Sequence, residues 1–123
     1  MTNILTVDDS LVSRKMLQHA VRASATGEVT FLDASHGQGA LALLASREVD
    51  ILFTDLYMSG MDGLELVRRV RGGGRDLPIV VVTSERSETV LQQLREAGAT
   101  RVLAKPFKPE DIKAVLDELS PCA

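Results

Sequence analysis

The chain has 123 residues, 45% of them hydrophobic, which suffices for one hydrophobic core and leaves no room for a second folded domain. Its 14 basic and 17 acidic residues give a net charge of −3, so charge does not point to nucleic acid or to an anionic membrane as the main partner. The one cysteine, Cys122, excludes an internal disulfide, and no run is typical of a signal peptide or a membrane span, so we expect one soluble, cytoplasmic domain.

Five short apolar runs rich in β-branched residues alternate along the chain with longer segments of helical periodicity. The runs predict strands at residues 4–7, 29–32, 51–53, 79–82 and 102–104. Between and after them, apolar residues recur at i, i+3, i+4 and i+7, as in the segments that begin at Gly63 and Ile112. This alternation predicts an α/β fold, in which a doubly wound parallel sheet carries helices on both faces.

Two of the predicted helices begin with recognisable capping residues. Asp62 followed by Glu65 is the pattern of a capping box. Pro109 followed by Glu110 and Asp111 suits the first turn of a helix, because proline is tolerated there and acidic residues complement the helix dipole.

Polar residues follow four of the five predicted strands. The first strand ends at Asp8 and Asp9, the third at Asp55, the fourth at Thr83 and the fifth at Lys105. Each residue alone is a weak signal, since an acid can cap a helix and a lysine can extend into solvent. Together they are specific, because ligands of open parallel sheets bind at the carboxyl ends of the strands.

This set of side chains predicts a particular chemistry. Clustered carboxylates repel one another and favour a hard divalent cation, and Mg²⁺ prefers carboxylates, waters and phosphate oxygens as ligands. The hydroxyl of Thr83 and the ammonium of Lys105 can both contact phosphoryl oxygens, which makes Asp55 the candidate nucleophile of a phosphoryl transfer. His19 and His36 are too few and too far apart in the sequence for a metal site, and we expect both on the surface.

Four motifs occur in a fixed order at these strand ends: V-D-D-S at 7–10, D-L-Y-M-S-G-M-D-G at 55–63, V-V-T-S at 81–84 and A-K-P-F at 104–107. The set resembles the receiver domains of bacterial two-component response regulators, essentially from end to end, and most of all the stand-alone chemotaxis type. The resemblance implies a flavodoxin-like sheet of order 2-1-3-4-5 with five helices. That order is the known order of the chemotaxis regulator itself and is carried over from it. We expect residues 1–123 to form a receiver domain without an output domain.

The resemblance also implies roles for the acidic residues. Asp55 would accept a phosphoryl group from a phosphohistidine on a sensor histidine kinase or a histidine phosphotransfer protein. Asp8, Asp9 and Asp55, together with the backbone carbonyl of Tyr57, would hold Mg²⁺. We expect the protein to assist its own phosphorylation and dephosphorylation rather than to act as an enzyme on a separate substrate.

The remaining residues of the resemblance concern signal output. Thr83 would move toward the new phosphoryl group while Lys105 neutralises its charge, and the bond between Lys105 and Pro106 is expected to be cis, as in many receivers. Phosphorylation would then shift the population toward a form that a downstream partner prefers. That partner is a motor component, a relay protein or the kinase itself.

The sequence departs from the family pattern at several positions. Ser59 stands where proline is common, and Val102 stands three residues before Lys105, where many receivers carry the aromatic residue that accompanies the threonine movement. Tyr57 has the bulk to cover the path of a hydrolytic water, and Glu85 follows two residues after Thr83. We hypothesise that Tyr57 tunes the lifetime of the phosphoryl group.

Three alternatives stay open. An aspartate-nucleophile phosphatase of the haloacid dehalogenase type would need a D-x-D motif after the first strand, whereas Asp8 and Asp9 are adjacent. A flavodoxin-like FMN carrier would share the fold, but the chain has only 3% aromatic residues to stack on a flavin. The third alternative is a phosphorylation-independent interaction module. Such a module would have no need for the costly cluster of acidic residues.

Overall fold

The computed structural model describes residues 2–119, in which strands and helices alternate strictly. The strands are β1 (Thr2–Val7), β2 (Val29–Ala34), β3 (Ile51–Asp55), β4 (Ile79–Thr83) and β5 (Arg101–Ala104). The helices are α1 (Leu11–Ser24), α2 (Gly37–Ser46), α3 (Gly63–Gly72), α4 (Glu88–Ala97) and α5 (Pro109–Leu119). All five predicted strands are present and slightly longer than predicted. Cys122 lies outside the described residues.

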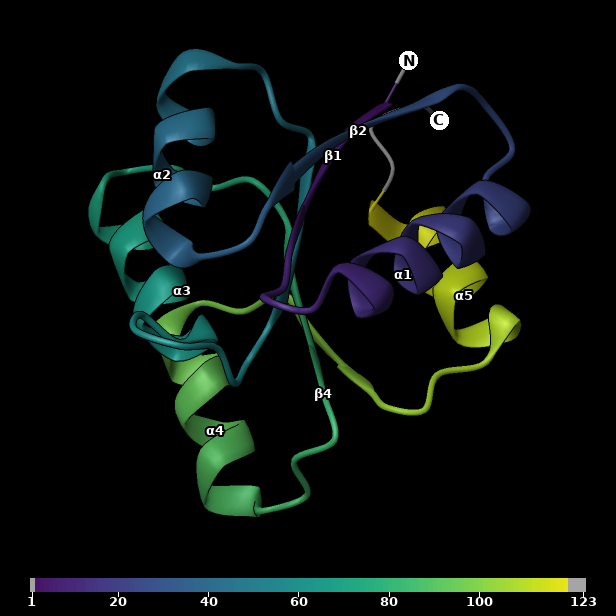
Figure 1. The fold of residues 1–123 in the computed structure, drawn as a ribbon. Helices are drawn as coiled ribbons and strands as arrows, with labels where there is room; N and C mark the ends of the chain where they lie inside the picture. Colours follow the sequence, from purple (N-terminus) through teal and green to yellow (C-terminus); the bar gives the residue numbers. More distant parts are fainter. Residues whose placement is uncertain (1, 120–123) are drawn as a thin grey trace.

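The strands form one parallel sheet in the order β2-β1-β3-β4-β5, which confirms the flavodoxin-like prediction. Helices α1 and α5 cover one face, and α2, α3 and α4 cover the other (Figure 1). The chain leaves β1 toward the first face and leaves β3 toward the second, so the loops after these neighbouring strands diverge. Such a divergence opens a crevice at the carboxyl ends of the two strands.

The core consists of two apolar layers, one on each face of the sheet. Within β3, Ile51 and Phe53 pack toward α1 and α5, while Leu52 packs toward α2, α3 and α4. All three are fully buried, as expected for a central strand of a parallel sheet covered on both faces. This burial explains why the first three residues of the strand form a continuous apolar run.

The helices bury the faces that their periodicity predicts. The buried residues of α3 are Gly63, Leu66, Val67 and Val70, and those of α5 are Ile112, Val115 and Leu116. The predicted capping box at α3 is half formed, because Asp62 Oδ1 accepts from the Glu65 amide at 2.9 Å but the Glu65 carboxylate pairs with Arg69 instead. Within residues 2–119, no helix combines the length and the apolar character needed to cross a bilayer.

Candidate functional site

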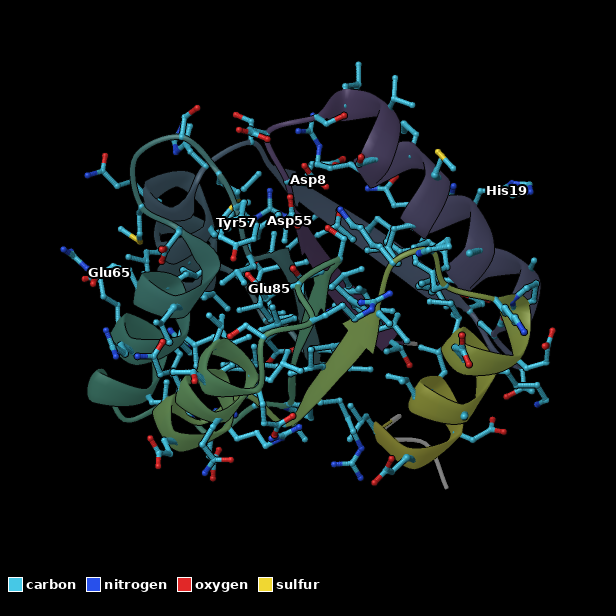
Figure 2. The ribbon with its side chains drawn as sticks, turned by 90° about the horizontal axis from the view of Figure 1, so that it is seen from below. Asp8, His19, Asp55, Tyr57, Glu65 and Glu85 are labelled. Atoms are coloured by element: carbon cyan, nitrogen blue, oxygen red, sulfur yellow. The ribbon has the colours of Figure 1, made fainter. Side chains whose placement is uncertain are left out.

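Three carboxylates meet at the carboxyl ends of β1 and β3. Oxygen atoms of Asp8, Asp9 and Asp55 all lie within 4.8 Å of one another. Asp8 is buried, Asp55 is half-buried and Asp9 is exposed. Figure 2 looks onto these strand ends and shows Asp8 and Asp55 side by side, with His19 far off on the outer side of α1. The structure therefore brings together the acidic residues that the strand-end pattern selected.

The backbone around Asp55 leaves little freedom to its side chain. Asp55 Oδ1 accepts from the amide of Leu56 at 2.9 Å, and the Leu56 carbonyl accepts from the amide of Gly63 at 2.7 Å. A Cβ atom on Gly63 would lie 2.3 Å from the Asp55 carbonyl oxygen and 2.8 Å from the Leu56 Cα. The start of α3 therefore packs directly against the end of β3, at a distance that only glycine permits.

Lys105 enters the same cluster from the end of β5. Its Nζ lies 3.3 Å from Asp55 Oδ1 and 3.8 Å from Asp8 Oδ2, so one ammonium group faces two carboxylates. The peptide bond from Lys105 to Pro106 is cis, as expected. Arg86, which the sequence analysis did not select, donates to the Lys105 carbonyl at 2.9 Å and joins the loop after β4 to the loop after β5.

The pKa of Asp55 is raised above its ordinary value, chiefly because burial penalises the charged form. The Lys105 ammonium and the Leu56 amide lower this pKa, and the neighbouring Asp8 carboxylate raises it. The ammonium group of Lys105 thus offsets only part of the penalty that burial and the Asp8 carboxylate place on the charged form of Asp55. Oxygen donors in such an arrangement suit a hard divalent cation, which would compensate the rest.

Thr83 ends β4, the strand beside β3, where Asp55 is paired with Val82. Thr83 is 1% exposed, and its Oγ1 accepts from the amide of Glu85 at 3.1 Å. The hydroxyl therefore holds the first turn of the loop after β4. A group bound at Asp55 that competed for this hydroxyl would act directly on that loop.

Tyr57 and Glu85 form a contact that the sequence did not predict, although both residues were singled out. The Tyr57 hydroxyl donates to the Glu85 carboxylate and bridges the loops after β3 and β4 (Figure 2). This hydrogen bond raises the pKa of Tyr57 and lowers that of Glu85. Tyr57 is 55% exposed, so its ring stands at the mouth of the site rather than in the core.

Comparisons with known proteins agree with this geometry. A family model for the response regulator receiver domain matches residues 4–117. The cyclic di-GMP phosphodiesterase response regulator RpfG of Xanthomonas campestris is 38% identical over 114 residues, covering 91% of this chain and 30% of RpfG. A chemotaxis protein CheY homolog of Campylobacter jejuni is 35% identical over 119 residues, covering 94% of this chain and 90% of the homolog.

Solved structures show the same likeness. The chemotaxis protein CheY4 of Vibrio cholerae matches with a TM-score of 0.86 at 32% identity, covering 97% of this chain and 98% of that chain. The signal receiver domain of an HD domain-containing protein from Pseudomonas fluorescens matches with a TM-score of 0.85 at 26% identity, covering 96% and 93%. Because the family model matches most of its length, the chain belongs to the response regulator receiver domain family of two-component systems.

Proposed function

We propose that Asp55 accepts a phosphoryl group from a phosphohistidine on a histidine kinase or a histidine phosphotransfer protein. The observation that carries this proposal is the position of Lys105 Nζ, 3.3 Å from Asp55 Oδ1, in a cluster that also holds Asp8 and Asp9. A carboxylate that is half-buried and has a cation beside it is equipped as a nucleophile toward a charged phosphoryl group.

The transfer exchanges one bond for another. A carboxylate oxygen of Asp55 forms a bond to phosphorus while the phosphorus–nitrogen bond of the donor breaks, and the departing imidazole nitrogen keeps the electron pair. Lys105 faces the phosphoryl oxygens as their charge develops. Hydrolysis later returns the free carboxylate and inorganic phosphate. The donor supplies the reactive bond, and the receiver supplies position and charge stabilisation.

Asp8, Asp9 and Asp55 are the residues proposed to hold Mg²⁺, and the backbone carbonyl of Tyr57 remains the predicted fourth protein ligand. The spacing of the three carboxylates within 4.8 Å suits a divalent cation, and so does the raised pKa of Asp55, which follows chiefly from burial and in smaller part from the Asp8 carboxylate. When bound there, Mg²⁺ would supply positive charge to the phosphoryl oxygens.

Signalling is proposed to follow through Thr83. A phosphoryl oxygen that takes the Thr83 hydroxyl would remove an acceptor from the Glu85 amide and would draw the loop after β4 toward Asp55. A downstream cytoplasmic protein that prefers this form would then be bound, whether motor component, relay protein or kinase. The protein would act on no separate substrate.

The direct test is to mix the chain with acetyl phosphate and Mg²⁺ and to follow its intact mass. We expect one added phosphoryl group on the wild type, none on the Asp55→Asn variant and none when EDTA replaces the metal. An Asp117→Asn variant, changed at an exposed carboxylate on α5, should be modified like the wild type. Modification that persists in Asp55→Asn would reject Asp55 as the acceptor. A wild type that no donor modifies would favour a phosphorylation-independent interaction module.

A further inference from the structure

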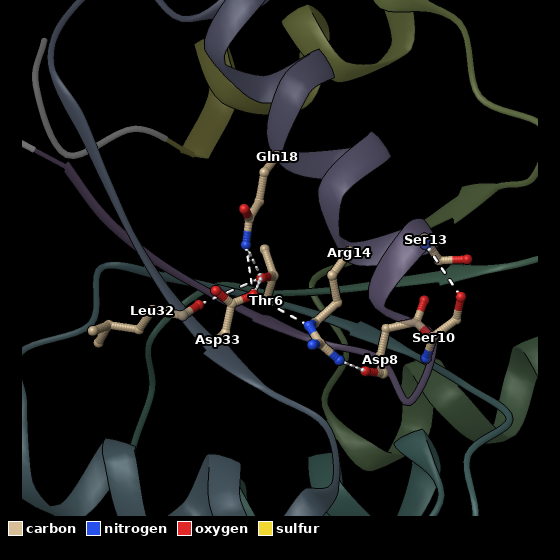
Figure 3. A network of polar contacts seen from close by, with 8 residues as sticks. All are labelled: Thr6, Asp8, Ser10, Ser13, Arg14, Gln18, Leu32 and Asp33. Carbon is tan, nitrogen blue, oxygen red and sulfur yellow. Dashed lines mark hydrogen bonds and ion pairs between the residues drawn. The ribbon is translucent and has the colours of Figure 1, made fainter.

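A partly buried polar network lies next to the acidic cluster, on the α1 side of the sheet (Figure 3). At its centre is Arg14, in the first turns of α1, whose side chain is only 12% exposed. Its Nη1 donates to the backbone carbonyl of Asp8 at 2.5 Å, and its Nε donates to Asp33 Oδ1 at 3.2 Å. One guanidinium therefore joins the backbone of the acidic loop to a carboxylate on β2.

Asp33 is held in turn by two further donors. Its Oδ1 accepts from Gln18 Nε2 at 2.7 Å and from Thr6 Oγ1 at 3.4 Å. Gln18 is 3% exposed and also donates to Thr6 Oγ1 at 2.8 Å. Thr6 and Asp33 are paired in register between β1 and β2. The carboxylate that accepts from Arg14 is thus also held by a residue of β1 and a residue of α1.

This network fixes the backbone at the point where the acidic residues leave β1. The Asp8 carbonyl belongs to the peptide that joins Asp8 to Asp9, so its orientation sets the direction of the chain between the two carboxylates. On the other side, Asp8 Oδ1 accepts from the amide of Ser10 at 2.9 Å. The loop is therefore anchored at its main chain by Arg14 and at its side chain by Ser10.

The planar guanidinium group suits this task, because its fork can donate to two acceptors in fixed directions. Helix α1 has independent means of stability, since Ser10 caps its first turn and Leu17 and Val21 are buried in the core. The stability of α1 therefore does not require a half-buried arginine that donates to the carbonyl of Asp8.

We propose that Arg14, held by Asp33, is a positioning residue for the divalent-cation site: it orients the Asp8–Asp9 backbone so that both carboxylates converge with Asp55. This inference rests on the proposed function to the extent that it takes the three carboxylates to be a cation site. Outer groups that orient metal ligands typically change metal affinity by about 10–100-fold when they are removed.

Electrostatics alone predicts the opposite change in cation affinity when Arg14 is replaced, so the inference can be tested sharply. Removing a positive charge close to a cation site should strengthen cation binding if charge is all that matters. Removing a positioning group should weaken binding despite that gain. Replacing Arg14 by lysine keeps the charge and loses the fork, so electrostatics predicts no change and positioning predicts a loss.

The experiment titrates the unphosphorylated 123-residue chain with Mn²⁺ alone and measures the free ion by electron paramagnetic resonance. Against the wild type, we expect about tenfold weaker binding for Arg14→Gln and a smaller loss for Arg14→Lys. The controls are Arg69→Gln and Arg69→Lys, which break an exposed arginine–carboxylate pair on α3. They should bind Mn²⁺ like the wild type. Circular dichroism at the titration temperature shows that each variant is folded.

The outcomes separate the two proposals. Arg14 variants that are folded and bind Mn²⁺ as tightly as the wild type, or more tightly, would overturn the positioning role and leave the phosphoacceptor proposal intact. A wild type that binds no Mn²⁺ would overturn the cation site and the inference with it. If Arg14→Gln does not fold, Arg14→Lys alone decides, because it retains the charge and the aliphatic stem.

Discussion

Lys105 and Asp55 lie in contact across a strand that separates them. Nζ of Lys105, at the end of β5, is 3.3 Å from Oδ1 of Asp55, at the end of β3, and β4 runs between the two strands. The lysine therefore reaches over the end of β4, where Thr83 lies. The Asp55 carboxylate, the Thr83 hydroxyl and the Lys105 ammonium thus lie at the ends of three adjacent strands. We therefore expect a change in charge at Asp55 to affect both Thr83 and Lys105.

Replacing Lys105 by methionine should slow phosphorylation of Asp55 by acetyl phosphate on the order of a hundredfold, because a preorganised charge is removed from the phosphoryl oxygens. Burial raises the pKa of Asp55 and the Lys105 ammonium opposes that effect, so the variant should raise this pKa further. Rates come from intact mass against time, and the pKa from the carboxyl carbon resonance of Asp55. Lys113→Met, on an exposed pair with Asp117, is the control. An unchanged rate and pKa would show that the contact carries no charge stabilisation.

Removing the charge of Asp55 should stabilise the metal-free protein at neutral pH. Because the folded-state pKa lies above the unfolded one, ionisation costs the folded state free energy above that pKa, and the cost vanishes as pH falls below the unfolded value. Asp55→Asn keeps an oxygen that can accept from Leu56 and carries no charge. We expect a gain of about 0.5–2 kcal/mol at neutral pH, which is typical when functional strain is relieved.

The measurement is urea unfolding of Asp55→Asn and wild type in EDTA over a pH series. The difference between the two proteins should shrink as pH falls through the raised pKa of Asp55. Asp117→Asn, at an exposed site, should differ little from wild type at any pH. A less stable Asp55→Asn at neutral pH would mean that the Lys105 contact outweighs burial and repulsion.

Tyr57 should slow the loss of the phosphoryl group. Tyr57 is exposed and its hydroxyl donates to Glu85, so we expect its ring to restrict the approach of water to Asp55. Tyr57→Asn should lose phosphoryl label severalfold faster. Tyr57→Phe keeps the bulk of the ring and loses the hydrogen bond to Glu85. Its rate of label loss should lie between those of the wild type and Tyr57→Asn. Label decay after donor removal measures the rates, and equal decay in all three proteins would end the hypothesis.

The sheet was predictable because each strand contains an apolar run, and polar residues follow four of the five predicted strands. Burial on both faces of a sheet makes such runs distinctive. The gathering of Asp8, Asp9 and Asp55 followed from topology alone, since parallel strands bring their ends to one edge. Contacts that depend on side-chain direction were not predictable. The Arg14 bond ends on a backbone carbonyl, which has no sequence signature.

The same limit explains two smaller differences. The Glu65 side chain was expected to return to the start of α3, but Arg69 lies one turn further along the helix and competes for the same carboxylate. Val102 stands where many receivers carry an aromatic residue. Its side chain is half-buried and packs against the core layer of α2, α3 and α4. A valine at this position is thus already packed against the core.

Gly63 should be indispensable to the geometry of Asp55, and α3 contains its own control. An added Cβ at Gly63 would lie 2.3 Å from the Asp55 carbonyl oxygen, so relieving the clash would shift the end of β3 or the start of α3 and displace Asp55. Gly63→Ala should therefore cost about 1–3 kcal/mol, as overpacking does in a buried contact. It should also slow phosphorylation by acetyl phosphate. Gly72, at the other end of α3, has nothing within 4 Å of such a Cβ.

Gly72→Ala should accordingly be neutral or slightly stabilising, by up to about 1 kcal/mol, because it restricts the unfolded chain at a compatible position. Urea unfolding and intact-mass rates are compared for both variants and the wild type. Both variants add one methyl group at an end of α3, but only the methyl group at position 63 would meet backbone atoms. A large loss of stability in Gly63→Ala alone would therefore report the packing of α3 on β3. Equal stability and equal rates in the two variants would mean that the end of β3 can shift freely, and that Asp55 does not depend on the close approach of α3.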